Sequence, residues 1–145
     1  MADKRATEPG CLYICGTPIG NMEDITLRAL KVLEEVDYIA AEDTRQTLKL
    51  LNHYNISKPL ISCHEHNEKQ RSFEIVSMLK EGRSVALVSD AGMPAISDPG
   101  STVINAAHEA GIKVSVVPGP TAESAALALS GYGGGRYVFE GFLQR

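Results

Sequence analysis

Polar and turn-forming residues follow each of five short apolar runs in this sequence. The five segments are GTPIGN (16–21), EDTR (42–45), HEHNE (64–68), SDAGMP (89–94) and PGPTAE (118–123). They supply carboxylates, imidazoles and a guanidinium, with glycines that let a ligand approach the backbone and prolines that stiffen the loops. If the apolar runs are parallel strands, these loops meet at one edge of the sheet, where open α/β sheets bind their ligands.

The segment 85–100 shows this change of character most clearly. Val85–Val88 is a short apolar run, rich in β-branched residues, of the kind found in a buried strand. A carboxylate, a glycine and a proline follow within six residues, and Asp98 adds a second carboxylate before a helix expected from Ser101. A plain connecting loop can carry such residues. However, all five loops after strands are of this type and the loops after helices are not, which favours a functional site at that edge.

The spacing of these residues disfavours several familiar chemistries. The loop 16–21 lacks the third glycine and the lysine of nucleotide-binding loops, which argues against a nicotinamide dinucleotide. His64 and His66 lie close to Cys63, but no second cluster has a zinc-site spacing, so no metal is predicted. Arg45 opposes the helix dipole expected at its position, which indicates an external anion as its partner.

The apolar pattern predicts an α/β domain with a parallel five-stranded sheet and helices on both faces. Strand-then-helix units occur five times in succession, which favours right-handed crossovers between parallel strands. The expected strands are Cys11–Cys15, Tyr38–Ala41, 59–63, Val85–Val88 and 114–117. The expected helix caps and buried helix positions include Asp24, Leu48, Leu51, Phe73, Leu79, Val103 and Thr121.

The rest of the chain is assigned by composition. Residues 1–10 are expected to be a loose polar tail, and residues 11–130 the α/β domain. Residues 131–145 form a glycine-rich segment with a final extended piece at 137–143.

Overall composition is that of an ordinary globular domain. The 145 residues are 43% hydrophobic and 22% charged, with a net charge of −4, so no strong basic excess indicates nucleic-acid binding. Cys11 and Cys15, four apart in a strand, would lie about 13 Å apart, beyond disulfide reach. Cys63 has no evident partner, so a reduced, cytoplasmic setting is expected. Neither a signal peptide nor a membrane helix is predicted.

Taken together in this order and spacing, the motifs GTPIGN, AEDTR, HEHN, SDAGMPAISDPG and VVPGPTA resemble those of a known family. This is the ribosomal RNA small subunit methyltransferase I family, a branch of the tetrapyrrole (corrin/porphyrin) methylase superfamily. The resemblance covers residues 11–145. It departs from the family at Cys15-Gly16, at residues 133–135, and at Met93, where a threonine is common.

The resemblance implies a fold of two α/β domains with the methyl donor in the cleft between them, of which this chain corresponds to the first. It implies transfer of a methyl group from S-adenosylmethionine to the ribose 2′-hydroxyl of a cytidine. That cytidine belongs to the decoding region of 16S rRNA, within the small ribosomal subunit. A cytoplasmic homodimer is expected, and the isolated domain is expected to be inactive.

The resemblance also implies roles for individual residues. The S-adenosylmethionine-binding residues would be Gly16, Pro18, Gly20, Asp90, Gly92, Met93, Pro94, Pro120 and Thr121. The RNA-binding residues would be Arg45, His66 and Asn67. A base that accepts the hydroxyl proton would assist the transfer. Asp43 and His64 are both candidates, and the sequence does not choose between them.

Two other functions remain open at this point. The same donor site could serve a tetrapyrrole or another small molecule, although the polar AEDTR and HEHN loops argue against this. The chain could also be a binding module without activity in this short form.

Overall fold

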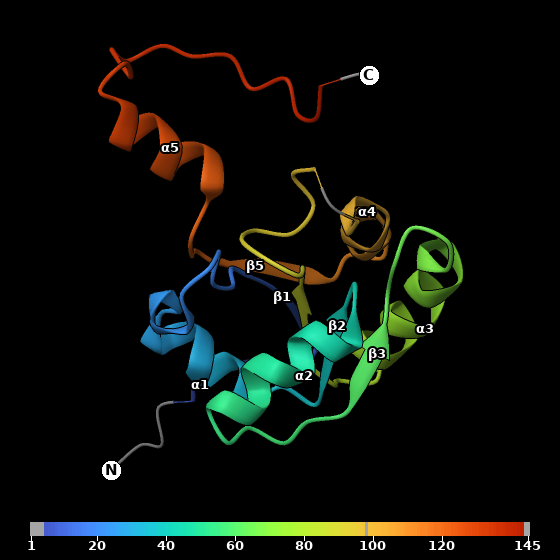
Figure 1. Cartoon of the computed structure of the whole chain (residues 1–145). Helices are drawn as coiled ribbons and strands as arrows, with labels where there is room; N and C mark the ends of the chain where they lie inside the picture. Colours follow the sequence, from blue (N-terminus) through green and yellow to red (C-terminus); the bar gives the residue numbers. More distant parts are fainter. Residues whose placement is uncertain (1–4, 98, 144–145) are drawn as a thin grey trace.

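The computed structural model describes residues 5–97 and 99–143, and these ranges contain a five-stranded sheet (Figure 1). The strands are β1 (Cys11–Cys15), β2 (Tyr38–Ala41), β3 (Leu60–Ser62), β4 (Val85–Val88) and β5 (Lys113–Val117). The helices are α1 (Leu27–Glu35), α2 (Thr44–His53), α3 (Glu68–Lys80), α4 (Ser101–Glu109) and α5 (Ala122–Ser130), with a 3-10 helix, η1 (Met22–Asp24). The strand order is β3-β2-β4-β1-β5, and all neighbours are parallel. The predicted fold class is confirmed.

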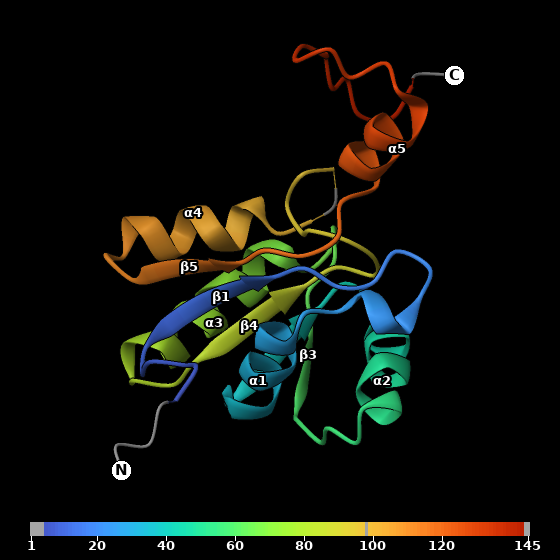
Figure 2. The same cartoon turned by 90° about the vertical axis from the view of Figure 1, so that its left-hand side faces the viewer.

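Helices cover both faces of the sheet, α1 and α2 on one face and α3 and α4 on the other (Figure 2). Leu33 and Leu51 belong to the first layer, whereas Ile75 and Val103 belong to the second, and none is more than 1% exposed. The central strands β1 and β4 are buried along their whole length, as expected for parallel strands with both faces covered. The loops that leave these strands therefore start from fixed points.

The carboxyl ends of the strands lie level with one another. Ala41 at the end of β2 pairs with Ser62 on one side and Val88 on the other. Cys15 at the end of β1 pairs with Val117 at the end of β5. This register places the five polar loops side by side at one edge of the sheet, as the sequence predicts.

The first long helix starts later than predicted. The side chain of Thr26 caps α1 by accepting a hydrogen bond from the backbone N–H of Ala29 at 3.0 Å. Asp24 instead ends η1, which Asn21 caps by accepting from the N–H of Glu23. The prediction of Asp24 as the cap was wrong because two other good capping residues flank it.

Two apolar side chains predicted to face the core are exposed. Leu48 is 48% exposed and Phe73 is 72% exposed. Thr47 and Ser72 are buried on the corresponding helix faces, and the Ser72 hydroxyl donates to the Glu68 carbonyl at 2.6 Å. An analysis of apolar periodicity misses such positions, because a buried hydroxyl can be satisfied by the backbone of its own helix.

The segment before β1 is attached to the domain. The N–H groups of Ala6 and Thr7 donate to the Glu35 carboxylate, and the N–H of Glu8 donates to the Tyr13 hydroxyl. This part therefore differs from the loose tail expected for residues 1–10, while residues 1–4 lie outside the described ranges.

The end of the chain has a different character. Helix α5 projects away from the sheet in both views (Figures 1 and 2), and none of its nine described residues is buried. Thr121 stands at its N-cap position, without a capping hydrogen bond from its side chain to any described residue. The described residues 137–143 contain no strand, so the predicted extended piece is an irregular segment.

Candidate functional site

The loops after β1 and β4 are joined by a pair of backbone hydrogen bonds. The N–H of Thr17 donates to the Gly92 carbonyl at 3.0 Å, and the N–H of Gly92 donates back to the Thr17 carbonyl at 3.0 Å. The buried Thr17 hydroxyl also donates to the Ser89 carbonyl at 3.3 Å. Gly92 has a φ of 79°, a conformation that favours glycine. These contacts fix the two loops as one unit.

The loop after β5 packs against this unit through glycine. A Cβ atom added to Gly16 would lie 2.6 Å from the Cα of Gly119, closer than real Cβ atoms come. A Cβ on Gly92 would meet the Pro120 carbonyl oxygen at 3.4 Å. The structure therefore gives Gly16 a packing role, whereas the resemblance gave it a place in the donor site.

Two hollows open beside the joined loops. The first hollow encloses about 190 Å³, and the second encloses about 360 Å³. The first hollow is lined by Thr17, Pro18, Gly20, Asn21, Met22, Gln46, Thr47, Leu50, Ser89 and Asp90. The second hollow is lined by Ile19, Ala91, Gly92, Met93, Ile96, Ser97, Thr121, Ala122, Glu123, Phe139, Gly141 and Phe142. Neighbouring residues of the same two loops thus line different hollows.

The residues predicted to bind the donor divide between these hollows. Pro18, Gly20 and Asp90 line the first hollow. Gly92, Met93 and Thr121 line the second. The remaining predicted donor residues, Gly16, Pro94 and Pro120, line neither of the two, and Asp98 lies outside the described residues.

Sequence reasoning missed several lining residues. Gln46 and Leu50 come from the first and second turns of α2, and Phe139 and Phe142 come from the irregular segment after α5. Gln46 lies three residues after Asp43, so its place on the same helix end was accessible from the sequence. Phe139 had no such signal.

The loop after β2 is tied to the loop after β4. The backbone N–H of Asp43 donates to the Asp90 carboxylate at 3.1 Å. The Asp43 carboxylate caps α2 by accepting from the N–H of Arg45 at 3.0 Å. Two predicted site residues from neighbouring strands, Asp43 and Asp90, are thus brought together.

Arg45 has a local partner, which corrects the assumption that only an external anion explains it. Its Nε and Nη2 atoms each lie 3.2 Å from an oxygen of the Asp43 carboxylate. The hydrogen bond from Arg45 lowers the pKa of Asp43, and the same bond raises the pKa of Arg45. The Arg45 side chain is nevertheless 87% exposed, so its remaining N–H groups face solvent.

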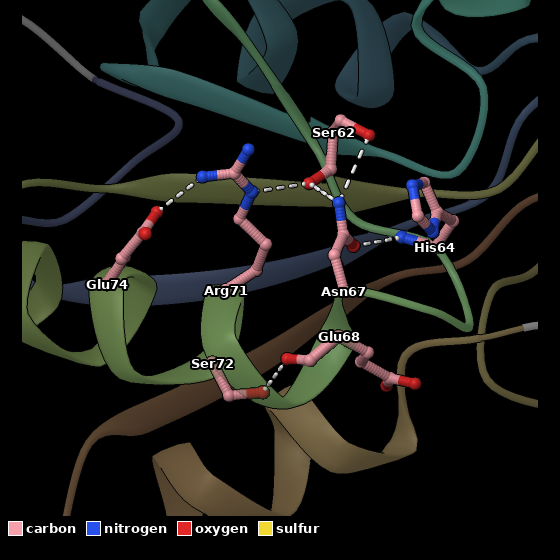
Figure 3. Close-up of polar contacts among 7 residues, drawn as sticks. All are labelled: Ser62, His64, Asn67, Glu68, Arg71, Ser72 and Glu74. Carbon is pink, nitrogen blue, oxygen red and sulfur yellow. Dashed lines mark hydrogen bonds and ion pairs between the residues drawn. The ribbon is translucent and has the colours of Figure 1, made fainter.

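The loop after β3 forms a compact turn that the Asn67 side chain organises (Figure 3). Its Oδ1 accepts from the N–H of His64 at 2.8 Å, and its Nδ2 donates to the Ser62 carbonyl at 3.2 Å. The N–H of His66 donates to Nδ1 of His64 at 3.2 Å. Arg71 donates to the same Ser62 carbonyl at 3.0 Å. Asn67, predicted to bind RNA, is therefore occupied within the turn, while His66 is exposed.

Glu68 connects this turn to the start of α4. Its carboxylate points away from the Ser62–Arg71 cluster (Figure 3) and accepts hydrogen bonds from the N–H groups of Gly100 at 2.8 Å and Thr102 at 3.0 Å. Gly100, the N-cap residue, has no side chain to cap the helix. Glu68 supplies that cap from α3 and so anchors the end of the loop that lines both hollows.

The described residues contain neither a candidate metal site nor an exposed thiol. Within residues 5–97 and 99–143, no group of three or more His, Cys, Asp or Glu side chains could hold a metal ion. The thiols of Cys11, Cys15 and Cys63 are free and buried, and burial raises the pKa of Cys15 to about 12 and that of Cys63 to about 11. These thiols therefore remain protonated near neutral pH. No helix in the same ranges is both long and apolar enough to cross a bilayer.

The fold and these loops define a methylase domain of the tetrapyrrole type. Residues 11–135 match the family described as Tetrapyrrole (Corrin/Porphyrin) Methylases, and the chain belongs to this family. Similar curated proteins are named Ribosomal RNA small subunit methyltransferase I, as the sequence resemblance predicts. The one from Thermotoga maritima is 59% identical over 136 residues, and the one from Pasteurella multocida is 52% identical over 134 residues.

These relatives are longer than this chain. The two alignments cover 94% and 92% of this chain but only 61% and 48% of the relatives. Uroporphyrin-III-C-methyltransferase from Thermus thermophilus has a similar structure, with a TM-score of 0.65 and 28% identity over 84% of this chain and 53% of that one. Diphthine synthase shares the fold, with a TM-score of 0.64 and 20% identity over 83% of this chain and 49% of that one.

Proposed function

We propose that this chain is the first domain of an S-adenosylmethionine-dependent rRNA methyltransferase. Its target is the ribose 2′-hydroxyl of a cytidine in the decoding region of small-subunit 16S rRNA. The names of the relatives support rRNA as the substrate, and the resemblance of the motifs supports the cytidine hydroxyl. The observation that carries the proposal is the hydrogen bond from Asp43 to Asp90, which links the loop expected to face RNA to the loop expected to face the donor.

The second hollow is the proposed donor site. Its volume of about 360 Å³ lies within the range of small-molecule sites. Met93, Ile96 and Phe139 offer apolar surface, and the polar side chains of Thr121 and Glu123 can orient an amino acid or ribose group. When bound, S-adenosylmethionine supplies a methyl group that its sulfonium already activates, so the protein must chiefly place the acceptor oxygen in line.

Asp43 is the better of the two candidates for the group that receives the hydroxyl proton. His64 Nδ1 accepts a hydrogen bond from the N–H of His66, so neutral His64 carries its proton on the other nitrogen and cannot accept there. Asp43 is ionised near neutral pH, as an aspartate ordinarily is, and the hydrogen bond from Arg45 lowers its pKa further. Asp43 would accept a hydrogen bond from the hydroxyl and orient it, and would take up its proton as the oxygen gains the methyl group. Because the pKa of Asp43 is low, the carboxyl then releases the proton to solvent.

The RNA strand would then approach over the loops after β2 and β3. Arg45 offers an exposed guanidinium, which suits phosphate because its planar fork donates two parallel hydrogen bonds. His66, from the loop after β3, is also exposed, whereas Asn67 shapes the turn. A second copy of the chain as partner and a cytoplasmic location are further parts of the proposal that rest on the resemblance.

Methyl transfer tests the proposal directly. The protein for this test joins residues 1–145 to the part of the Thermotoga maritima relative that this chain does not cover. Labelled donor is offered with small ribosomal subunits or with a porphyrin precursor, and RNA digests are analysed by mass spectrometry. We expect 2′-O-methylcytidine, and Asp43→Ala should abolish it. Methylation of the porphyrin precursor, or of a nucleobase, would contradict the proposal.

A further inference from the structure

The first hollow has the build of a pocket for a small planar ring. Its buried lining consists of Leu50, which is 6% exposed, and of the hydroxyl residues Thr17, Thr47 and Ser89, with the half-buried Met22 beside them. Its rim carries the exposed polar side chains of Asn21, Gln46 and Asp90. The hollow thus combines some apolar surface with many hydrogen-bonding groups, which suits a small polar ring better than a purely apolar ligand.

Two side-chain amides on this rim have unused hydrogen-bonding groups. The Gln46 amide has no hydrogen-bond partner among the described residues. Asn21 uses its Oδ1 to cap η1, but its Nδ2 has no partner within the same described residues. An amide presents a donor beside an acceptor, which is the pattern on the edge of a nucleobase.

The volume limits what the hollow can take. About 190 Å³ is less than the ~300 Å³ at the lower end of sites for drug-sized ligands. A tetrapyrrole or a dinucleotide is too large to enter, whereas a single six-membered ring is not. A single ring of a larger molecule can therefore enter, with the rest of that molecule outside the hollow.

The surroundings indicate what the rest of the molecule is. Arg45 directly precedes Gln46 on α2, and its exposed guanidinium can bind a phosphate. The Arg45 guanidinium is bonded to the Asp43 carboxylate, and the backbone N–H of Asp43 donates to Asp90, which lines the first hollow. Contacts through Asp90 and Asp43 thus connect the first hollow to a cation that can bind phosphate, as base and phosphate are connected in a nucleotide.

We propose that the first hollow binds the unstacked pyrimidine base of the acceptor nucleotide, an inference that rests on the proposed function. Gln46 and Asn21 hydrogen-bond the edge of the base, and Arg45 binds an adjacent phosphate. Proteins usually read RNA sequence on unstacked bases in this way. The ribose then lies at the joined loops, with the donor in the second hollow on the far side of the Thr17–Gly92 pair.

The experiment is a nuclear magnetic resonance titration of the isotope-labelled chain with three probes. Cytidine 5′-monophosphate at millimolar concentrations should shift the amide signals of Asn21, Gln46 and Thr47. Inorganic phosphate should shift the signals of Arg45 and its chain neighbour Gln46 but not that of Asn21, which comes from a different loop. S-adenosylhomocysteine tests the donor site separately, through Gly92 and other residues of the second hollow.

Gln46→Ala should weaken binding of cytidine 5′-monophosphate about fivefold, the value of one lost hydrogen bond. Gln70→Ala is the matched control, because Gln70 is exposed on α3 and does not line the first hollow. If the nucleotide leaves Asn21, Gln46 and Thr47 unshifted, or shifts them no more than phosphate does, the base site is overturned. Shifts of the same residues by S-adenosylhomocysteine would assign the first hollow to the donor instead. Failure of rRNA methylation in the assay above would reject the proposed function independently.

Discussion

The sheet and its four covering helices differ sharply from α5 and the segment that follows it. Leu12, Ile39 and Val85 in the sheet are fully buried, whereas Leu129 in α5 is 90% exposed and Phe142 beyond it is 82% exposed. The first hollow is built entirely from residues 17–90, which belong to the sheet region. The second hollow borrows half of its lining from residues 121–142.

This contrast teaches that the two hollows differ in how far they are preformed. The sheet region has its own core and hydrogen-bonded loops, so the first hollow depends on nothing outside it. The residues that α5 and the following segment bring to the second hollow are not held by a core. Large exposed apolar side chains indicate a surface that another part or partner covers. Affinity at the second hollow should therefore depend on that cover, and affinity at the first should not.

The largest expected effect is the loss of donor affinity in this chain by itself. We expect S-adenosylhomocysteine to bind at least about 100-fold more weakly than to the joined protein, a difference of ~2.8 kcal/mol. The reason is that ordering residues 121–142 costs entropy that a covering domain or partner would offset. Calorimetric titration of both proteins measures the difference. Saturable micromolar binding to the 145-residue chain would remove the contrast between the hollows.

The second prediction compares two glycines, one in each region. Gly16→Ala would place a Cβ 2.6 Å from the Gly119 backbone, which cannot move aside as a flexible side chain could. We expect a loss of about 2 kcal/mol in the free energy of unfolding, or ~4–8 °C in Tm. Gly133→Ala is the control, because its Cβ would meet nothing closer than a Leu127 side-chain atom at 3.8 Å. Thermal unfolding measures both, and equal Tm values would show that the close approach of the loops is not required.

Much of the fold could be predicted from the sequence because β1 and β4 are buried on both faces. Such strands read as unbroken apolar runs, and Cys11–Cys15 and Val85–Val88 have the predicted bounds. The buried faces of the helices were harder to predict. Thr47 and Ser72 are buried polar residues, and their hydrogen bonding depends on their surroundings. The helix cap was predicted wrongly where Asn21, Asp24 and Thr26 lie within six residues. Which of them caps a helix depends on the direction in which the chain enters it.

The sequence predicted that the polar loops meet at one edge of the sheet, but not that their residues line two separate hollows. Strand order makes Asp43 and Asp90 neighbours, and the sequence does not encode that order locally. The split between the hollows arises because Pro18 and Ile19 point into different spaces, a consequence of the Thr17–Gly92 pairing. The role of Glu68 in capping α4 was invisible for the same reason, since 32 residues separate it from Gly100.

The third prediction concerns Glu68, which we expect to act as a positioning residue for the loop between the hollows. Glu68→Ala removes the acceptor for two backbone N–H groups, so the KM for donor in the joined protein should rise about fivefold. Glu68→Gln keeps an acceptor oxygen and should restore most of the affinity. Glu74→Ala is the control, because Glu74 pairs with Arg71 on the outer side of the turn. A lower Tm with an unchanged KM would reduce Glu68 to a purely structural cap.

The smallest effect expected is on the titration of Asp43. Arg45 lowers the pKa of this carboxyl by hydrogen bonding to it, so Arg45→Ala should raise the pKa back toward its ordinary value. The sign for stability follows from linkage. A carboxyl with a lowered pKa in the folded state stabilises the fold above its unfolded pKa, and this contribution is lost as the pH falls through the folded value. The acid side of the stability profile should therefore flatten in Arg45→Ala.

Carbon-detected titration of the Asp43 carboxyl measures the pKa, and chemical unfolding at several acidic pH values measures the stability. Lys49→Ala on the same helix removes a positive charge without touching the Asp43 carboxylate, so it controls for net charge. Because both Asp43 and Arg45 reach into solvent, added salt should shrink the difference between the variants. An Asp43 pKa that is the same in wild type and Arg45→Ala would show that the pair does not persist in solution. The guanidinium would then be free for an external anion, as its place at the start of α2 first indicated.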